Sequence, residues 1–234
     1  MRRFFGRLEN GKIILEGDEF NHLKNVLRMG EGSELFVSLN DEFDYVCVVE
    51  KMNKNFAICN INDKQVCSAN PTKEIVLFQA VAKGPKFEFI VQKGTEIGVT
   101  KIVPFESEYC VGKISDSKNG RMQSIIQNAC KQCERSIMPV VDKTIDIKDV
   151  AAQIKDFDIV LFANERAFDS EKIKNLEKYN KIGIIIGAEG GFSQKEKELL
   201  VNSGAVSVSL GRRILRCETA AVAMMSLVSI LSGN

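Results

Sequence analysis

The chain has 234 residues, of which 44% are hydrophobic and 27% are charged, a balance typical of a globular protein of one or two domains. The formal net charge of +1 excludes a strongly basic polyelectrolyte, so any nucleic-acid contact has to come from local clusters of cations. The apolar runs are too short to span a bilayer, and the start MRRFFGRLENGK lacks the apolar stretch of a signal peptide. We therefore expect a cytoplasmic protein with no membrane partner.

The seven cysteines are an odd number and lie mostly inside apolar segments, which is typical of reduced, buried thiols. Cys130 and Cys133 form one CxxC pair. A zinc site would need a second pair, so we interpret these two as small residues on the buried face of a helix. His22 is the only histidine and the carboxylates are not clustered, so the sequence implies no metal.

The first 70 residues show the alternation of β-strands, and candidate strands lie at 35–39, 45–49 and 56–61. Turn-forming residues separate them, at Asn10-Gly11, at Gly30 and Gly32, and at Asn53–Asn55. A short helix is expected over 18–28, with Asp18 as its cap. Short strands at this spacing predict a small closed barrel, followed by a linker at 68–73.

After Pro71, apolar strands alternate with amphipathic helices. The expected strands are 74–81, 101–105, 158–163, 181–186 and 206–210. The expected helices lie near 86–97, 119–137, 170–178, 194–203 and 218–231. This alternation predicts a mainly parallel sheet with helices on both faces. We therefore expect two domains, a barrel over 1–70 and an α/β domain over 71–234.

Two of these helices carry aligned polar residues. Lys93 and Glu96 share the face of helix 86–97 that lies opposite its apolar stripe. On helix 119–137, Asn128, Gln132 and Arg135 follow one another at spacings of four and three. These polar faces are equally compatible with a binding surface and with ordinary solvated surface.

The most specific segment is IIIGAEGGFSQKE, in which an apolar strand runs directly into Gly187–Gly191. Ser193 and Glu196 then have the spacing of a capping box that starts a helix. Loops at the carboxyl ends of parallel strands bind ligands, and glycines allow a ligand close to the backbone. The loop lacks the residues of a phosphate-binding P-loop or a dinucleotide fingerprint. Glu189 favours a cationic ligand such as a sulfonium.

The second specific segment is SLGRRILRCETAAVAMMSLVSIL, in which a strand ends at Leu210 and Gly211 turns the chain. The arginines that follow suit a rim that faces RNA, and the apolar Ile214 and Leu215 between them suit the wall of an adenine pocket. The helix beyond is apolar nearly all round, which requires burial. Its small residues permit close packing of helices, within the core or across a dimer.

Together, these two segments resemble the bacterial 16S ribosomal RNA uridine N3-methyltransferase family of the SPOUT superfamily. The resemblance extends over essentially the whole chain. It includes RRFF at the start, HLKNVLRMGEG (22–32), VAKGPKFEFIVQKGTEIGVTKIVPF (81–105) and NACKQCERSIMP (128–139). Cys130, Cys133 and Cys217 stand where the family usually has small residues.

This resemblance implies a small PUA-like β-barrel that helps to bind RNA, followed by a SPOUT domain with a mainly parallel sheet and a deep trefoil knot. It implies S-adenosylmethionine as cofactor and S-adenosylhomocysteine as product. The implied partners are 16S ribosomal RNA or the small ribosomal subunit, and a second copy of the chain, since the family forms homodimers. The implied reaction is methylation of N3 of a specific uridine.

Site residues follow from matching these segments to their roles. Cofactor contacts are expected from Gly187, Ala188, Glu189, Gly190, Gly191, Leu210, Gly211, Ile214, Leu215 and Thr219. RNA contacts are expected from Arg2, Arg3, Lys24, Arg28, Lys83, Lys93, Gln132, Arg212 and Arg213. Residues 1–70 hold nine basic and eleven acidic side chains, so an RNA role for this part depends on local clustering and on the resemblance.

Methyl transfer to uridine N3 requires the N3 proton to leave, and a positioned base would assist. Glu189 and Glu218 are the candidate bases, although either carboxylate also suits the N-terminus of the helix that follows it. Arginine stays protonated and is a poor base. We therefore expect Arg216 and Arg135 to stabilise negative charge on the uracil oxygens, a role for which Lys93 is a further candidate.

Three alternatives are weighed against this interpretation. The first is a SPOUT methyltransferase that acts on another ribosomal or transfer RNA position. The second is an oxidoreductase that binds a dinucleotide through the GAEGG loop. The third is an RNA-binding adaptor without enzymatic activity, which would have no need of two glycine-rich loops at strand ends.

Overall fold

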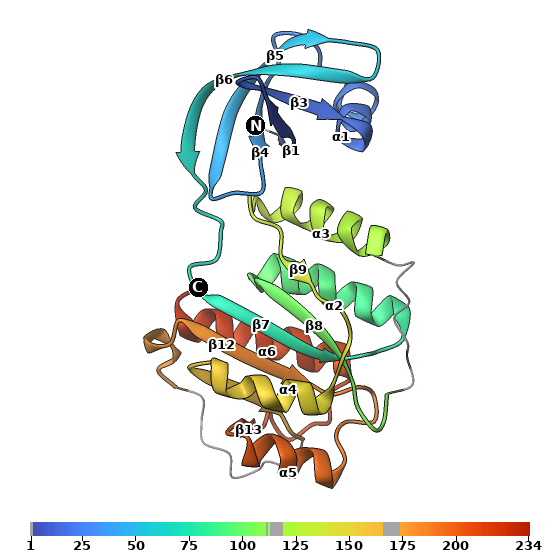
Figure 1. Ribbon diagram of the computed structural model, residues 1–234, viewed down its shortest axis with the longest axis vertical. Coiled ribbons are helices and arrows are strands. Elements are labelled where there is room, and N and C mark those ends of the chain that lie inside the picture. The colour runs from blue at the N-terminus through green and yellow to red at the C-terminus, as the bar shows by residue number, and fades with distance from the viewer. Residues whose placement is uncertain (1, 111, 113–118, 166–173) are drawn as a thin grey trace. The chain divides into compact units, whose positions relative to one another are not determined.

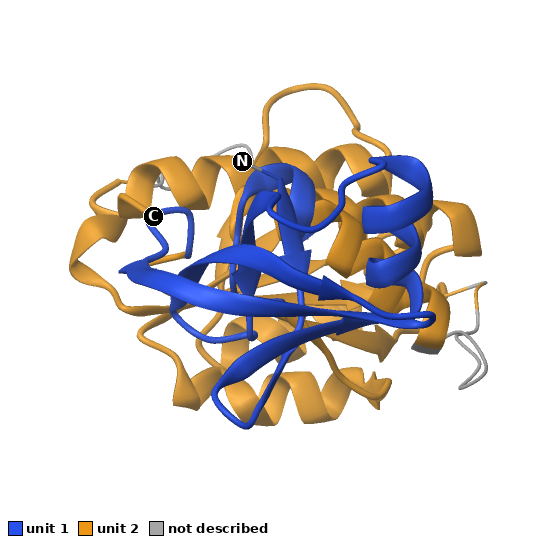
Figure 2. Cartoon of the chain, turned by 90° about the horizontal axis from the view of Figure 1, so that it is seen from above, with its two compact units in different colours: residues 1–70, 130–138 blue, residues 71–129, 139–234 orange. Residues whose placement is uncertain are grey.

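The computed structural model describes residues 2–110, 112, 119–165 and 174–234, which form two compact units, coloured separately in Figure 2. Unit 1 comprises Met1–Asn70 together with Cys130–Met138, and unit 2 comprises Pro71–Ala129 and Pro139–Asn234. Cys130–Met138 therefore packs with unit 1, although its position in the sequence predicts the second domain. Within the described ranges, no helix combines the length and apolarity needed to cross a lipid bilayer.

Unit 1 is built on a curled sheet of six strands in the order β1-β4-β5-β6-β3-β2. Its strands are β1 (Arg3–Phe5), β2 (Arg7–Glu9), β3 (Lys12–Glu16), β4 (Glu34–Ser38), β5 (Phe43–Met52) and β6 (Phe56–Val66). The three predicted strands correspond to β4, β5 and β6. The sequence missed β1 and β2, because three residues are too few to show an alternating pattern, and also β3, whose apolar residues follow one another without alternation.

The two edge strands of this sheet, β1 and β2, are separated in the chain only by Gly6. A Cβ atom on Gly6 would lie 2.8 Å from Ile13 Cγ2 and 2.9 Å from Val37 Cγ1, so this position requires glycine. The sheet therefore curls until its edges meet through the continuous chain, whereas the hydrogen-bonded ladder stays open between β1 and β2. Phe4, Ile13 and Leu35 are among the buried side chains inside.

Two local predictions for unit 1 have different outcomes. The Asn10-Gly11 turn is confirmed, because both residues have positive φ, 50° and 76°, and they connect antiparallel β2 and β3. The expected helix is present as α1 (Gly17–Asn21) and the π-helical turn η1 (His22–Val26). The prediction that Asp18 caps it is wrong. Because the helix begins one residue earlier, Asp18 lies in its first turn.

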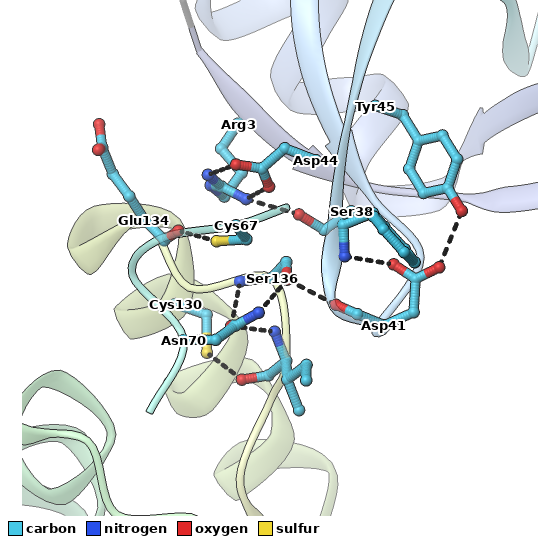
Figure 3. A network of polar contacts seen from close by, with 12 residues as sticks. Arg3, Ser38, Asp41, Asp44, Tyr45, Cys67, Asn70, Cys130, Glu134 and Ser136 are labelled. Atoms are coloured by element: carbon cyan, nitrogen blue, oxygen red, sulfur yellow. Dashed lines mark hydrogen bonds and ion pairs between the residues drawn. The ribbon is translucent and has the colours of Figure 1, made fainter. Parts of the chain in front are cut away.

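A network of polar contacts fixes both parts of unit 1 to each other (Figure 3). The guanidinium of Arg3 donates to Ser38 Oγ (2.8 Å) and makes a two-pronged ion pair with Asp44, in which the Arg3 side chain is only 7% exposed. Asn70 Oδ1 accepts the Ser136 N–H (3.0 Å), and Asn70 Nδ2 donates to Ser136 Oγ (2.7 Å). The contacts of Arg3 lie within residues 1–70, whereas the Asn70–Ser136 bonds join that part to Cys130–Met138.

Unit 2 contains a seven-stranded sheet in which every pairing is parallel, as the sequence predicted. The order is β10-β8-β7-β12-β11-β13, and β9 also pairs with β8. The strands are β7 (Glu74–Ala80), β8 (Lys101–Glu106), β9 (Val140–Val141), β10 (Ile145–Asp146), β11 (Ile159–Ala163), β12 (Lys181–Ile186) and β13 (Val206–Val208). The trefoil knot that the resemblance implies stays a prediction.

Helices cover both faces of this sheet, with α4 in front of it and α6 behind it in Figure 1. The helices and helical turns are α2 (Gly84–Ile97), α3 (Asn119–Cys133), α4 (Ile147–Gln153), η3 (Ile154–Asp156), η4 (Leu176–Lys178), α5 (Gln194–Asn202) and α6 (Cys217–Ser232). Helix α2 packs on α6. At their contact, a Cβ on Gly94 would lie 3.4 Å from Met225 Sδ.

One predicted helix is shorter than expected, and another lies partly outside the residues that the structure describes. The expected helix 119–137 ends at Cys133, because Glu134 adopts a left-handed φ of 65° and turns the chain. Ile137 lies beyond the end of the helix and is 37% exposed. Residues 170–173 of the expected helix 170–178 lie outside the described residues, 174–175 are not helical, and the last three residues form η4.

Helix α6 is buried on one face only. Ala221, Met224, Met225 and Val228 are buried, whereas Val222 and Leu227 are half-buried and Ile230 is 76% exposed. The apolar residues around this helix predicted complete burial. Within a single chain, that prediction is therefore correct for one face and wrong for the other.

All seven cysteines are free thiols, and five of them are buried. Burial raises the pKa of the Cys130 thiol to about 12, against the opposing influence of the nearby Arg135 charge. Cys133, the other member of the CxxC pair, is half-buried. A thiol with so high a pKa is protonated at neutral pH and is a poor nucleophile, which supports a packing role for Cys130.

Candidate functional site

Three loops meet at the carboxyl ends of β12, β11 and β13, which are neighbours in the sheet. In open α/β sheets, ligands bind in crevices at the carboxyl ends of the strands. A cavity of about 220 Å³ lies here, lined by residues 163–165, 186–192, 210–211 and 213–215 and by Cys217 and Ala220.

The loop after β12 forms a tight turn whose shape depends on glycine. Gly191 has a φ of 67°, and its N–H donates to the carbonyl of Ala188 (2.9 Å). A Cβ on Gly187 would lie 3.1 Å from the Phe192 ring, so the backbone here approaches its neighbours closely. The Phe192 ring is anchored in the core, where it stacks on Phe105 at 6.4 Å between centroids.

The predicted capping box at the start of α5 is confirmed. The Ser193 side chain accepts the Glu196 N–H (3.4 Å), and the Glu196 carboxylate accepts the Ser193 N–H (2.8 Å). Both residues are buried. The capping box thus fixes the end of the glycine loop to a helix on one side while Phe192 fixes it to the core.

The loop after β13 turns at Gly211, whose φ is 111°. Ser209 Oγ bonds to both the N–H and the carbonyl of Gly211, at 3.3 Å each. Ile214 and Leu215 line the cavity, yet Ile214 is 85% exposed. A large apolar side chain at the mouth of a cavity is suited to cover an apolar part of a ligand.

Lys86 joins the two carboxylates that the sequence singled out. Its Nζ lies 3.2 Å from Glu189 Oε1 and 3.5 Å from Glu218 Oε2. Lys86 is in the first turn of α2, Glu189 lines the cavity and Glu218 begins α6. One ammonium between two carboxylates leaves this cluster with a net charge of −1, which suits a cationic ligand.

Both carboxylates of this cluster are held in their ionised form. Burial pushes the pKa of Glu189 upward, but its own backbone N–H and Lys86 outweigh burial, so that pKa lies below its usual value. Burial likewise opposes ionisation of Glu218, but hydrogen bonds from its own backbone N–H and from the Cys217 thiol, together with Lys86, lower its pKa. Each carboxylate is therefore a weak proton acceptor at neutral pH.

Comparison with known proteins gives a consistent result. An RNA methyltransferase domain model matches residues 68–229, and an RNA methyltransferase PUA domain model matches residues 15–62. Ribosomal RNA small subunit methyltransferase E from Mesomycoplasma hyopneumoniae is 35% identical, over 97% of this chain and 98% of that protein. The Bacillus subtilis protein of the same name is 29% identical, over 98% and 96%. The chain belongs to the ribosomal RNA small subunit methyltransferase E family.

Two solved structures that are similar to this chain are complexes with S-adenosyl methionine. Ribosomal RNA small subunit methyltransferase E from Neisseria gonorrhoeae has a TM-score of 0.89 and 26% identity, with 99% of this chain and 98% of that chain covered. A methyltransferase from Legionella pneumophila has a TM-score of 0.86 and 28% identity, with 97% and 96% covered. Unit 1 is thus PUA-like and unit 2 is a SPOUT-type α/β domain, as the sequence predicted.

With the methyltransferase family established, the expected cofactor contacts can be compared with the cavity of unit 2. Nine of the ten line it, namely Gly187, Ala188, Glu189, Gly190, Gly191, Leu210, Gly211, Ile214 and Leu215. Thr219 is the exception, since its side chain is exposed in the first turn of α6. Within the described ranges, no group of three or more His, Cys, Asp or Glu side chains is arranged to hold a metal ion.

The two arginines expected to act on the substrate lie in different surroundings. Arg216 is exposed at the N-cap of α6, immediately after the loop that lines the cavity. Arg135 was expected on a polar helix face, but it lies beyond the end of α3 and is only 2% exposed within unit 1. Burial lowers its pKa. The predicted surface position of Arg135 is therefore wrong.

The residues expected to contact RNA differ in how far their side chains are exposed to solvent. The exposed ones are Arg2, Lys24, Arg28, Lys83, Gln132, Arg212 and Arg213. Lys93 is half-buried and ion-paired with Glu96 (2.8 Å). Arg3 was expected at an RNA-facing surface, but its side chain is buried against Asp44, which leaves it unsuited to bind a phosphate.

Sequence reasoning missed two parts of the site. Residues 163–165, which follow β11, line the cavity, and Glu165 there is paired with Lys197 on α5 (3.2 Å). Their position at the end of a predicted parallel strand was the available signal. The role of Lys86 had no comparable signal, because its partners lie more than 100 residues away in the chain.

Proposed function

We propose that this protein transfers the methyl group of S-adenosylmethionine to N3 of a specific uridine in 16S ribosomal RNA. The main support for this proposal is that residues of the loops Gly187–Gly191 and Gly211–Leu215 line one cavity at the carboxyl edge of a parallel sheet. Related proteins of the same family are named as methyltransferases of the small-subunit ribosomal RNA, and two structural relatives are complexes with S-adenosylmethionine.

The residues of the cavity fit this cofactor. The glycines of both loops carry no side chain between the backbone and the cavity, so a ligand can approach the backbone closely, and Ile214 and Leu215 provide apolar walls. The cluster of Glu189, Lys86 and Glu218 has the charge to balance a sulfonium. We propose the nine lining residues as cofactor contacts and leave Thr219 out. When bound, the cofactor supplies a methyl group on a positively charged sulfur.

The remaining chemistry falls to side chains of this chain. Both carboxylates are paired with Lys86 and have lowered pKa values. Glu189 and Glu218 are therefore better suited to balance the charge of the sulfonium than to accept the N3 proton. Arginines in the loop after β13 stay protonated and can stabilise negative charge on the uracil oxygens as N3 gives up its proton to solvent water. We propose Arg213, which lines the cavity, and Arg216 for this role.

Nucleoside mass mapping tests the proposed reaction directly. Undermodified 16S RNA and small subunits are incubated with the protein and S-adenosylmethionine, digested and mapped. We expect one N3-methyluridine per RNA molecule. A methyl group on another base, or on a transfer RNA in the same assay, would contradict the proposed target. Calorimetric titration with NAD in place of S-adenosylmethionine is the control for a dinucleotide enzyme, and we expect no heat of binding.

We also propose that the protein acts as a homodimer through helix α6. The support is the uncovered apolar face of that helix, where Ile230 is 76% exposed and Leu227 is half-buried. A surface of this kind is stabilised when a second copy covers it. Light scattering after size-exclusion chromatography is expected to give twice the chain mass, and Ile230→Lys is expected to shift the mass towards one chain. A monomeric wild type would disprove the dimer.

A further inference from the structure

Tyr109 presents an exposed aromatic ring beside the proposed cofactor cavity. It follows β8 at the carboxyl edge of the unit 2 sheet, and it is 44% exposed. The turn that carries it is closed by the Cys110 N–H, which donates to the Ser107 carbonyl (3.0 Å), and by the Ser107 N–H, which donates to Cys110 Sγ (3.3 Å). The closed turn fixes the backbone from which the exposed ring projects, so little backbone entropy remains to be lost when the ring binds a ligand.

One buried carboxylate ties this turn to the cofactor loop. Glu196 Oε1 accepts the Glu108 N–H (2.8 Å), while Glu196 Oε2 accepts the Ser193 N–H (2.8 Å). Glu196 is only 7% exposed. The residue that caps α5 therefore also fixes the position of Tyr109 relative to the glycine loop.

Gly190 brings the two loops into direct contact. A Cβ on Gly190 would lie 2.7 Å from Tyr109 Cβ, so only glycine allows this approach. Gly190 lines the cofactor cavity, and it also lines a second, open hollow together with Glu108, Tyr109 and Cys110. The hollow that holds the tyrosine ring and the cavity therefore adjoin at one glycine.

We propose that Tyr109 is the platform on which the target uracil stacks when it lies next to the cofactor, an inference that depends on the proposed function. A base in structured RNA has to leave its stack to reach a methyl donor, and it then needs a new stacking partner. A tyrosine ring provides one, and stacking on it is tolerant of the identity of the base. Tyr109 thus positions the base, and other groups select uracil.

The first experiment compares Tyr109→Phe with Tyr109→Leu under steady-state conditions with small-subunit RNA. Leucine keeps the Cβ that contacts Gly190 but removes the ring. We expect Tyr109→Leu to raise KM for the RNA about 10- to 100-fold, Tyr109→Phe to stay within about twofold, and the Kd for S-adenosylmethionine to stay unchanged in both. Tyr179→Leu is the matched control, since Tyr179 precedes β12 at the opposite, amino edge of the same sheet.

The second experiment measures the stacking itself without any turnover. An RNA fragment that contains the mapped uridine is compared with the same fragment carrying an abasic nucleotide at that position. We expect the wild type and Tyr109→Phe to bind the intact fragment at least about 10-fold more tightly. For Tyr109→Leu, we expect the two affinities to be equal.

The outcomes separate this inference from the proposed function. If the wild type methylates the RNA but Tyr109→Leu keeps a normal KM and a normal preference for the intact fragment, Tyr109 is not the platform. If Tyr109→Leu loses affinity for the intact and the abasic fragment equally, the ring contacts the RNA elsewhere, and the inference is again wrong. If the wild type binds cofactor and RNA but transfers no methyl group, the proposed function fails before any Tyr109 variant is compared, so this outcome is distinct from a failure of the Tyr109 inference alone.

Discussion

The two arginine clusters of this chain look alike in the sequence and differ completely in the structure. Near the start, Arg3 is buried in an ion pair with Asp44, and Arg7 is paired with Glu9 and Glu16. Near the end, Arg212, Arg213 and Arg216 are exposed, and in the part of the chain that the structure describes no ion pair joins them to a carboxylate.

The difference follows from what surrounds each cluster. The first lies in a unit whose residues 1–70 hold more acidic than basic side chains, so its guanidinium groups find carboxylates nearby. The second lies on a short loop between β13 and α6, beside a cavity. Cations that the protein does not neutralise itself remain available for a substrate anion. We therefore propose that the first cluster serves mainly folding and the second substrate binding.

The largest expected effect is on stability. Arg3→Ala leaves Asp44 buried without its cation, and removal of one partner of a buried pair costs about 3–5 kcal/mol. The free energy of unfolding, measured by urea denaturation, checks this. Arg2→Ala is the matched control, because Arg2 is exposed, and we expect its cost to stay below about 0.5 kcal/mol. Equal costs for the two variants would remove the contrast between the clusters.

The second effect is on catalysis. Arg213→Ala removes a cation from the cavity, and we expect kcat/KM for RNA methylation to fall about 10- to 100-fold, while the free energy of unfolding changes by less than about 0.5 kcal/mol. Arg212→Ala is the control, since Arg212 is equally exposed but does not line the cavity, and a smaller loss is expected. An Arg213→Ala enzyme with normal kinetics would show that exposure alone does not mark a substrate contact.

The third effect concerns a cation that does have carboxylate partners. Lys86→Met leaves Glu189 and Glu218 without their shared ammonium, so the cluster becomes more negative and favours the cationic cofactor over its neutral product. We expect the ratio of the Kd for S-adenosylhomocysteine to that for S-adenosylmethionine to rise about two- to fivefold. Glu189→Gln is expected to lower the same ratio in calorimetric titrations.

Lys93→Met provides the control for this change, because Lys93 is on the same helix and pairs with Glu96. We expect its ratio of affinities to match the wild type. If Lys93→Met and Lys86→Met shift the ratio equally, the effect comes from overall charge, and the cluster has no specific part in cofactor selection.

These contrasts also show how far the sequence could predict the molecule. Five strands of unit 2, namely β7, β8, β11, β12 and β13, were predicted because buried parallel strands are apolar throughout, whereas the two-residue strands β9 and β10 were missed. The two cavity loops were predicted because glycines follow such strands. Strands as short as β1 and a helix as short as α4 carry too little periodicity to be recognised.

Exposure and pairing were harder to predict than secondary structure. Arg3 has no charge available for a ligand because Asp44 is paired with it. Arg213 keeps its charge available because, among the described residues, no carboxylate forms an ion pair with it. Neither fact is a local property of the sequence. The role of Lys86 likewise depends on β12 lying beside β7, because that arrangement brings Glu189 next to α2. Arg135 was misplaced because the left-handed Glu134 ends its helix.

The smallest expected effect is a pH dependence of stability that belongs to the carboxylate cluster. The folded pKa values of Glu189 and Glu218 lie below those of the unfolded chain, since their hydrogen bonds and Lys86 outweigh burial. Such groups stabilise the fold above the unfolded pKa of about 4.3, and this stabilisation is lost as the pH falls through the folded pKa. The wild type should therefore exceed the Glu189→Gln/Glu218→Gln variant in free energy of unfolding at pH 7, and the difference should shrink below pH of about 4. A difference that is constant from pH 7 to pH 3 would mean that the two carboxyl groups titrate alike in the folded and unfolded chain, and that Lys86 does not hold them ionised.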